Sequence, residues 1–147
     1  MKNVRNALRS ELKDLGKASD VLSHSLDKCS KIQVRADMSF EELESFEALT
    51  ARFARLSDIV TKKILRYFDV IDLEDAGTVR DRINRSEKKE LITSSEDMIE
   101  IRSLRNEIAH EYKPDTIYAM FERVLELAPV LLKNVELIIL RSKKYLS

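Results

Sequence analysis

The chain has 147 residues, of which 44% are hydrophobic and 35% charged, and its 26 basic residues balance its 26 acidic ones. Gly and Pro together make up about 3% of the sequence, against about 12% in an average protein. This composition favours an amphipathic helical bundle and argues against a β-sandwich or barrel, which needs many tight turns. The length suits a single domain, residues 1–147, and the zero net charge is not typical of a nucleic-acid-binding protein.

A single cysteine, Cys29, excludes an internal disulfide framework and a four-cysteine zinc site. The sequence has no cluster of metal ligands, so we expect neither a metal nor another cofactor. It has no run of about 18 apolar residues, and its charged N-terminal segment lacks the apolar core of a signal peptide. We therefore expect a cytoplasmic protein that does not cross a membrane.

Apolar residues at three- and four-residue spacing predict two long helices in the first half of the chain. The first helix is expected from about Val4 to Cys29, and the second begins at a capping box formed by Ser39 and Glu42. The second helix carries one stripe that should face the core: Phe46, Leu49, Phe53, Leu56, Val60, Ile64 and Phe68.

The second half of the chain predicts one short helix and two further long ones. The short helix runs from Thr78 to about Lys89, and the third long helix opens at a capping box of Thr93 with Glu96.

The third long helix is expected to reach about Tyr112, because Pro114 then breaks the chain. Asp115 or Thr116 caps the last helix, which fades at about 145–146. Pro129 should kink this helix without ending it, since the apolar spacing continues beyond it. The predicted fold is thus an all-α bundle of four long helices plus one short helix.

The residues that carry candidate chemistry lie at the end of the third long helix. Residues 103–115 read SLRNEIAHEYKPD, in which Arg105, Asn106, His110 and Tyr112 form the pattern R-N-x-x-x-H-x-Y. At about 100° per residue, Arg105 points along the apolar face of this helix, where an unpaired charge would be costly. We therefore expect Arg105 to meet a carboxylate, a partner subunit or an anionic ligand. Asn106 and His110 are four residues apart and share the flank beside that face.

At these residues the sequence resembles the HEPN ribonuclease superfamily, whose motif is Arg, four to six residues, then His. The fuller pattern, with Asn106 after Arg105 and Tyr112 after His110, is similar to HEPN toxins paired with minimal nucleotidyltransferase (MNT) antitoxins. The segment 48–66 also looks like that group, so the resemblance extends over most of the chain. It implies a HEPN-like bundle, and a homodimer that places the paired Arg and His groups in a cleft between subunits. It also implies metal-independent RNA cleavage, and Tyr112 as the target of AMP transfer by the MNT partner.

The chemistry of RNA cleavage suits these residues. The 2′-hydroxyl must lose a proton as it attacks the adjacent phosphate, and the 5′-oxygen must gain one as it leaves. Histidine can carry out either transfer near neutral pH, which gives His110 the acid–base role. Arg105 would stabilise charge on the phosphoryl oxygens. Asn106 would orient His110 or donate a hydrogen bond to the phosphate. Arg105 and His110 are therefore the predicted catalytic residues of an endoribonuclease toxin in a toxin–antitoxin pair.

Other interpretations stay open at this point. Without the family resemblance, Arg105 could form an intramolecular ion pair, and His110 could be a partly exposed residue at a helix C-terminus. The same cleft could instead belong to a non-catalytic module that binds a nucleotide or docks a nucleotidyltransferase, or to a purely structural helical dimer. Several basic residues are candidates for tracking an RNA backbone or equally for an ordinary solvated face: Arg52, Arg55, Lys62, Lys63, Arg66 and Arg102.

Overall fold

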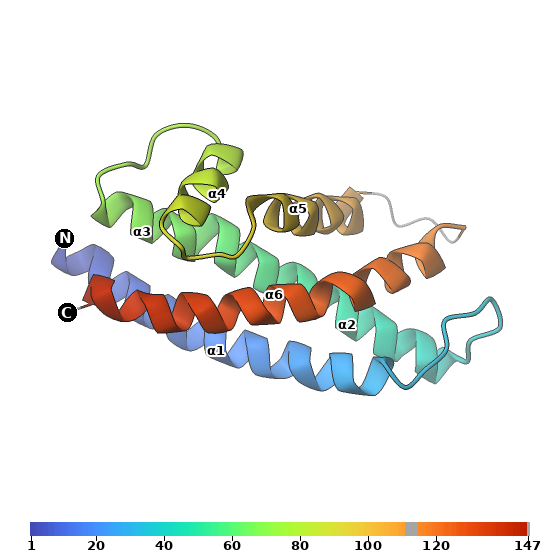
Figure 1. Cartoon of the computed structure of the whole chain (residues 1–147). Coiled ribbons are helices and arrows are strands. Elements are labelled where there is room, and N and C mark those ends of the chain that lie inside the picture. The colour runs from blue at the N-terminus through green and yellow to red at the C-terminus, as the bar shows by residue number, and fades with distance from the viewer. Residues whose placement is uncertain (111–114, 147) are drawn as a thin grey trace.

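The computed structural model describes residues 1–110 and 115–146, which fold into helices joined by short loops. Figure 1 shows a bundle in which both ends of the chain lie at the same end. The Arg5 side chain donates a hydrogen bond to the Tyr145 carbonyl there (3.0 Å). The helices are α1 (Lys2–Cys29), α2 (Phe40–Asp58), η1 (Ile59–Ile64), α3 (Leu65–Ile71), α4 (Val79–Lys88), α5 (Ser95–His110) and α6 (Ile117–Leu146).

The predicted all-α bundle is confirmed, because every regular element of the described residues is a helix. Helices α2, η1 and α3 form one uninterrupted long helical segment. With α1, α5 and α6 this makes four long helices, and α4 is the short one. Helices α2 and α6 lie between α1 and α5, and the core fills the space that they share. Aromatic rings contribute to it: Phe46 of α2 stacks on Phe121 of α6 with ring centroids 4.9 Å apart.

The second long helical segment differs from the prediction in one respect: residues Ile59–Ile64 form a π-helix. The predicted stripe repeats at four-residue steps from Leu56 to Phe68, and such a stripe drifts about 40° per step round an α-helix. A π turn contains more residues than an α turn, so it takes up part of this drift. As a result Leu56, Val60, Ile64 and Phe68 are all fully buried.

The helix starts confirm one of the two predicted capping boxes and correct the other. Ser39 and Glu42 cap each other's backbone N–H groups as predicted (3.1 and 2.9 Å). The box predicted at Thr93 and Glu96 is wrong. The Ser94 hydroxyl accepts the Asp97 N–H instead (3.2 Å), and α5 begins at Ser95.

The shift at this helix start has a tertiary cause. Both the backbone N–H and the hydroxyl of Thr93 donate to the side-chain oxygen of Asn134, a buried residue of α6 (2.9 and 3.3 Å). Thr93 is therefore held by α6 and cannot cap α5.

The two terminal helices are close to their predicted bounds. The first begins at Lys2 and not at Val4, two residues early, because a helix N-terminus needs no apolar residue in its first turn. The last begins directly after Thr116 and continues through Pro129 to Leu146, so the proline does not end it.

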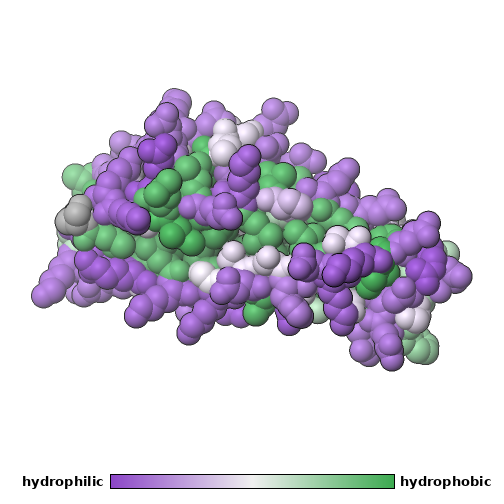
Figure 2. Space-filling view, turned by 60° about the horizontal axis from the view of Figure 1, so that its bottom comes forward, coloured by the Kyte–Doolittle hydropathy of each residue, from purple (hydrophilic) through white to green (hydrophobic). Residues whose placement is uncertain are grey.

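The surface is largely charged. Figure 2 shows hydrophilic side chains along the rims of one face, with apolar side chains gathered between them. Among residues 1–110 and 115–146, no helix is long and apolar enough to cross a membrane.

Candidate active site

Arg105 makes a two-point ion pair with Asp58, the last residue of α2. Its Nε donates to Asp58 Oδ1 at 2.6 Å and its Nη2 donates to Asp58 Oδ2 at 2.8 Å. Helix α5 packs against α2, which brings these two residues together although they are 47 positions apart in the sequence. A carboxylate is one of the three partners predicted for Arg105. The intramolecular ion pair is also what we expect for Arg105 without the family resemblance.

The Asp58–Arg105 pair is partly shielded from water. The Arg105 side chain is 22% exposed and that of Asp58 is 30% exposed. Burial alone acts to raise the pKa of Asp58, but the hydrogen bonds and charge of Arg105 outweigh it and hold that pKa below its ordinary value. The same hydrogen bonds raise the pKa of the Arg105 guanidinium. Both groups are therefore charged at neutral pH.

The geometry of this pair leaves part of the guanidinium unused. Arginine has five N–H donors in a planar fork, and the Nε–Nη2 edge of Arg105 is the one that faces Asp58. The opposite edge consists of Nη1 and the second N–H of Nη2, and it meets no acceptor in the described part of the chain. A phosphate oxygen pair can be bound bidentately at such an edge.

Asn106 and His110 lie on the solvent side of α5, and both are exposed. His110 is the last residue of α5, a position where a helix favours a cation. Helix geometry separates it from Arg105 by about 7.5 Å along the axis and about 140° round it. The two side chains therefore leave α5 in different directions, and helix geometry alone does not converge them on one phosphate. Tyr112 lies outside the described residues.

Three of the predicted RNA-binding residues come together beside Asp58. Arg55, Lys62 and Lys63 line a pocket of about 400 Å³ between α1 and the α2–η1 segment. Three carboxylates line the same pocket, since Asp58 is joined there by Glu11 and Asp14 of α1.

These opposite charges form ion pairs, one within the α2–η1 segment and one between η1 and α1. Lys62 lies 3.5 Å from Asp58, and Lys63 lies 3.4 Å from Glu11. The pocket is thus close to neutral, and both interpretations of the basic residues, RNA track and solvated face, stay open.

The other three candidate RNA-binding residues lie elsewhere. Arg52 donates hydrogen bonds to the Ser25 hydroxyl (2.6 Å) and the Val21 carbonyl (3.2 Å) of α1, and it lines a separate pocket with His24. Arg66 is exposed in α3, and Arg102 is partly buried in α5. At about 100° per residue, a regular α-helix would place Arg52, Arg55, Lys62, Lys63 and Arg66 on one flank. The π-helix at Ile59–Ile64 changes the angle between the residues before it and those after it, so this angular count does not apply to the segment.

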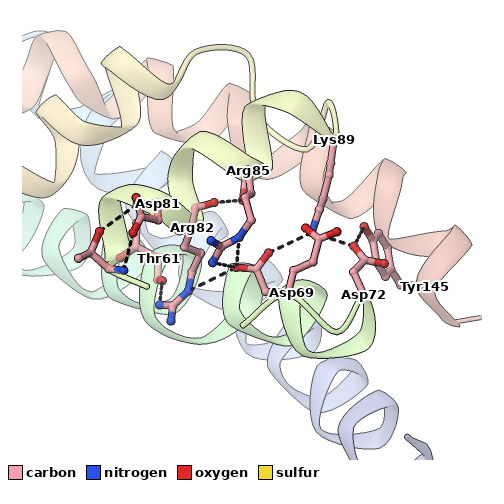
Figure 3. Close-up of polar contacts among 11 residues, drawn as sticks. Thr61, Asp69, Asp72, Asp81, Arg82, Arg85, Lys89 and Tyr145 are labelled. Atoms are coloured by element: carbon pink, nitrogen blue, oxygen red, sulfur yellow. Dashed lines mark hydrogen bonds and ion pairs between the residues drawn. The ribbon is translucent and has the colours of Figure 1, made fainter. Parts of the chain in front are cut away.

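A second charged cluster was not found from the sequence. Figure 3 shows Asp69 of α3 facing α4, where its carboxylate meets Arg85 Nη2 at 2.8 Å and Lys89 Nζ at 3.0 Å. Lys89 also contacts Asp72 (2.9 Å), which accepts a hydrogen bond from the Tyr145 hydroxyl (2.7 Å). We call Asp69, Asp72, Arg85, Lys89 and Tyr145 the Asp69 cluster. Both oxygens of its central carboxylate are occupied by cations, so it has the character of a structural joint between α3, α4 and α6.

The described residues contain no group of three or more His, Cys, Asp or Glu side chains that could hold a metal ion. What the fold and the site define is an all-α bundle with a side-on Arg–Asp pair on α5, the helix that ends at an exposed His. Comparison with protein-family models and with curated proteins finds no match to the chain. The resemblance to HEPN toxins therefore rests on the residues of the motif and stays a prediction.

Proposed function

We propose that this protein is a metal-independent endoribonuclease, acting in the cytoplasm as the toxin of a toxin–antitoxin pair. The observation that carries the proposal is the side-on contact of Asp58 with Arg105, which leaves a charged bidentate edge of the guanidinium without an acceptor among residues 1–110 and 115–146, at the site of the R-N-x-x-x-H-x-Y pattern. The exposed Asn106 and His110 that follow Arg105 on the same helix are the groups that the proposed reaction uses.

In the proposed reaction, one histidine accepts the proton of the attacking 2′-hydroxyl and another protonates the leaving 5′-oxygen. The phosphodiester bond to the 5′-oxygen breaks as the bond from the 2′-oxygen to phosphorus forms. Arg105 stabilises the charge that gathers on the phosphoryl oxygens, and Asn106 orients the phosphate or His110. Each chain supplies one His110, so two proton transfers require two copies.

A homodimer supplies the second histidine. The two motif helices would approach each other across a twofold axis, which sets the same patch of each chain against itself. The divergence of Arg105 and His110 on α5 supports this arrangement, because Arg105 of one copy and His110 of the other can converge where those of one copy do not.

The proposed partner is a minimal nucleotidyltransferase antitoxin that transfers AMP to Tyr112. This part rests on the resemblance alone. The added phosphate would carry negative charge and would compete with RNA for the cations of the site.

The test is cleavage of RNA by the purified protein with a metal chelator present. We expect wild-type cleavage to persist under chelation, and to fall at least about 100-fold in His110→Ala and in Arg105→Ala. His24→Ala is the matched control, because His24 is the other histidine of the chain and is also exposed on a helix. Equal loss in His24→Ala, or full activity in His110→Ala, would overturn the assignment.

A second candidate is a non-catalytic module that binds a nucleotide or docks a nucleotidyltransferase. The near-neutral pocket beside Asp58 favours it, because paired cations attract an RNA backbone weakly. Under this alternative the wild type binds its partner or a nucleotide but leaves RNA intact at every protein concentration.

A further inference from the structure

We propose that Asp58 is a positioning residue for the cleavage reaction. It holds the Nε–Nη2 edge of Arg105, and this sets the opposite edge of the guanidinium toward the phosphate. The inference rests on the proposed ribonuclease function, and it concerns a residue that lies outside the R-N-x-x-x-H-x-Y pattern, in a different helix.

The contact has the geometry that this role needs. Both carboxylate oxygens of Asp58 are engaged by one guanidinium, at 2.6 and 2.8 Å, so the plane of the guanidinium is fixed as well as its distance. A free arginine side chain would sample many rotamers before it met a phosphate. Fixing it in advance removes that search from the reaction step.

The backbone around Asp58 is itself held in place. Its neighbours Ser57 and Ile59 are buried, and the π-helix η1 starts directly after it. The packed backbone therefore gives the Asp58 carboxylate a defined attachment point from which it contacts Arg105.

Asp58 also sets the charge of the site. It lies between Arg105 and Lys62, so two cations share one carboxylate and the trio carries a single net positive charge. Removing the negative charge from Asp58 would leave both cations uncompensated. Such a change should strengthen RNA binding while it releases Arg105 from its position.

This combination gives Asp58→Asn an unusual kinetic signature. We expect kcat to fall about 10- to 100-fold because Arg105 is misplaced. We expect Kd for a non-cleavable RNA analogue to fall about two- to fivefold, because one repelling carboxylate is gone. A merely structural role would lower the active fraction and would not tighten binding. Asp58→Glu keeps the carboxylate and should recover part of kcat.

The matched control is Glu11→Gln. Glu11 lies in the same pocket and pairs with Lys63, but it does not contact Arg105. Its change removes one carboxylate from beside the basic residues, so it should tighten RNA binding to a similar extent without the fall in kcat.

A direct readout accompanies the kinetics. The Nε–H proton of Arg105 should give a slowly exchanging, low-field nuclear magnetic resonance signal in the wild type, and this signal should disappear in Asp58→Asn. Circular dichroism melting confirms that each variant is folded, and Asp58→Ala, which also removes the carboxylate, replaces Asp58→Asn in the comparison if the latter does not fold.

The outcomes separate this inference from the function on which it rests. If the wild type cleaves RNA and Asp58→Asn has the wild-type kcat, Asp58 is not a positioning residue and the ribonuclease assignment stands. If kcat and RNA affinity fall together, with no recovery in Asp58→Glu, the contact is structural and the inference is overturned. If the wild type shows no cleavage that depends on His110, the proposed function itself fails, and the positioning role fails with it.

Discussion

Asp58 and Asp69 lie eleven residues apart in the same helical segment, and each binds an arginine side chain. Their surroundings differ. Asp58 is 30% exposed and meets Arg105 at the rim of the bundle, whereas Asp69 is 1% exposed and lies between α3 and α4. One helical segment thus carries two carboxylate–arginine pairs, one at the rim of the bundle near water and one in the interior of the bundle.

The two arginines are also used differently. Arg105 presents two donor atoms to the two oxygens of Asp58, and the other edge of its guanidinium meets no acceptor in the part of the chain that the structure describes. In the Asp69 cluster, Arg85 donates to one oxygen of Asp69 from both Nε and Nη2, while Lys89 takes the other oxygen (Figure 3). Arg82 adds a third positive charge 3.9 Å away and donates to the Thr61 carbonyl of η1.

The comparison teaches that burial separates the roles of these ion pairs. A buried carboxylate must have its partners around it, because an unpaired charge in the interior is costly, and those partners join α4 to the rest of the bundle. A carboxylate at the rim is solvated in part, so its pair contributes little to folding and can serve to orient an arginine. Loss of Asp69 should therefore affect stability, and loss of Asp58 should affect activity.

The largest expected effect on stability is that of Asp69→Ala. It leaves Arg85 and Lys89 partly buried without their shared partner, so the free energy of unfolding should fall by about 3 kcal/mol. Urea denaturation followed by circular dichroism measures it. Asp20→Ala, at an exposed position of α1, is the control and should change stability by less than about 0.5 kcal/mol. A fall in kcat of the folded Asp69→Ala protein would break the division of roles.

Tyr145→Phe should have a smaller effect, about 1 kcal/mol, because it removes one hydrogen bond to Asp72 from the edge of the Asp69 cluster. The ring contact with Phe68, 4.5 Å between centroids, should be retained.

The same tyrosine gives a pH-dependent readout. Burial, followed by the hydrogen bond to Asp72, raises the pKa of Tyr145. Its contribution to stability is therefore present below the ordinary tyrosine value of about 10, and is lost as the pH rises through the higher folded value. Tyrosinate absorbance during an alkaline titration should show a late-titrating phenol that is missing in Tyr145→Phe. If all phenols titrate together in the wild type, the cluster is more open than its geometry indicates.

The smallest effect on stability is expected for the Asp58–Arg105 pair at the rim of the bundle. A double-mutant cycle with Asp58→Asn and Arg105→Gln should give a coupling energy of about 0.5–1 kcal/mol at neutral pH. Because the folded pKa of Asp58 is lowered, this coupling is present above the ordinary aspartate value of about 3.9 and is lost as the pH falls through the folded value. A coupling as large as that in the Asp69 cluster would show that the two pairs do not differ in kind.

The fold was largely predictable from local features. Apolar spacing and the shortage of Gly and Pro identify the helices, because a helix buries its own stripe and satisfies its own backbone hydrogen bonds. The capping box at Ser39 is similarly local, since its partners are three residues apart. The cap of α5 was not predictable in the same way, because Thr93 is drawn away by Asn134, a residue 41 positions later.

The candidate site was likewise predictable only in its local features. Helix periodicity places Arg105 beside an apolar face and so predicts that it needs a partner, and the tertiary structure identifies that partner as Asp58. Nothing local marks Asp58 among the acidic residues of the chain, since its role depends on how α5 packs on α2. The π-helix that follows Asp58 could not be predicted from the sequence for a related reason, because it depends on which side chains the rest of the bundle buries.

The sequence by itself thus determined the helical class and the number of helices, and it carries the prediction that residues 103–115 hold the chemistry. Each of these depends on interactions between residues that are close along the chain. Only the tertiary structure decided which carboxylate holds Arg105, how four of the six candidate RNA-binding residues are divided between two pockets, and that Asp69 is buried among cations. These outcomes depend on contacts between helices, whose relative positions follow from packing of the whole core and are not encoded in the spacing within any one helix.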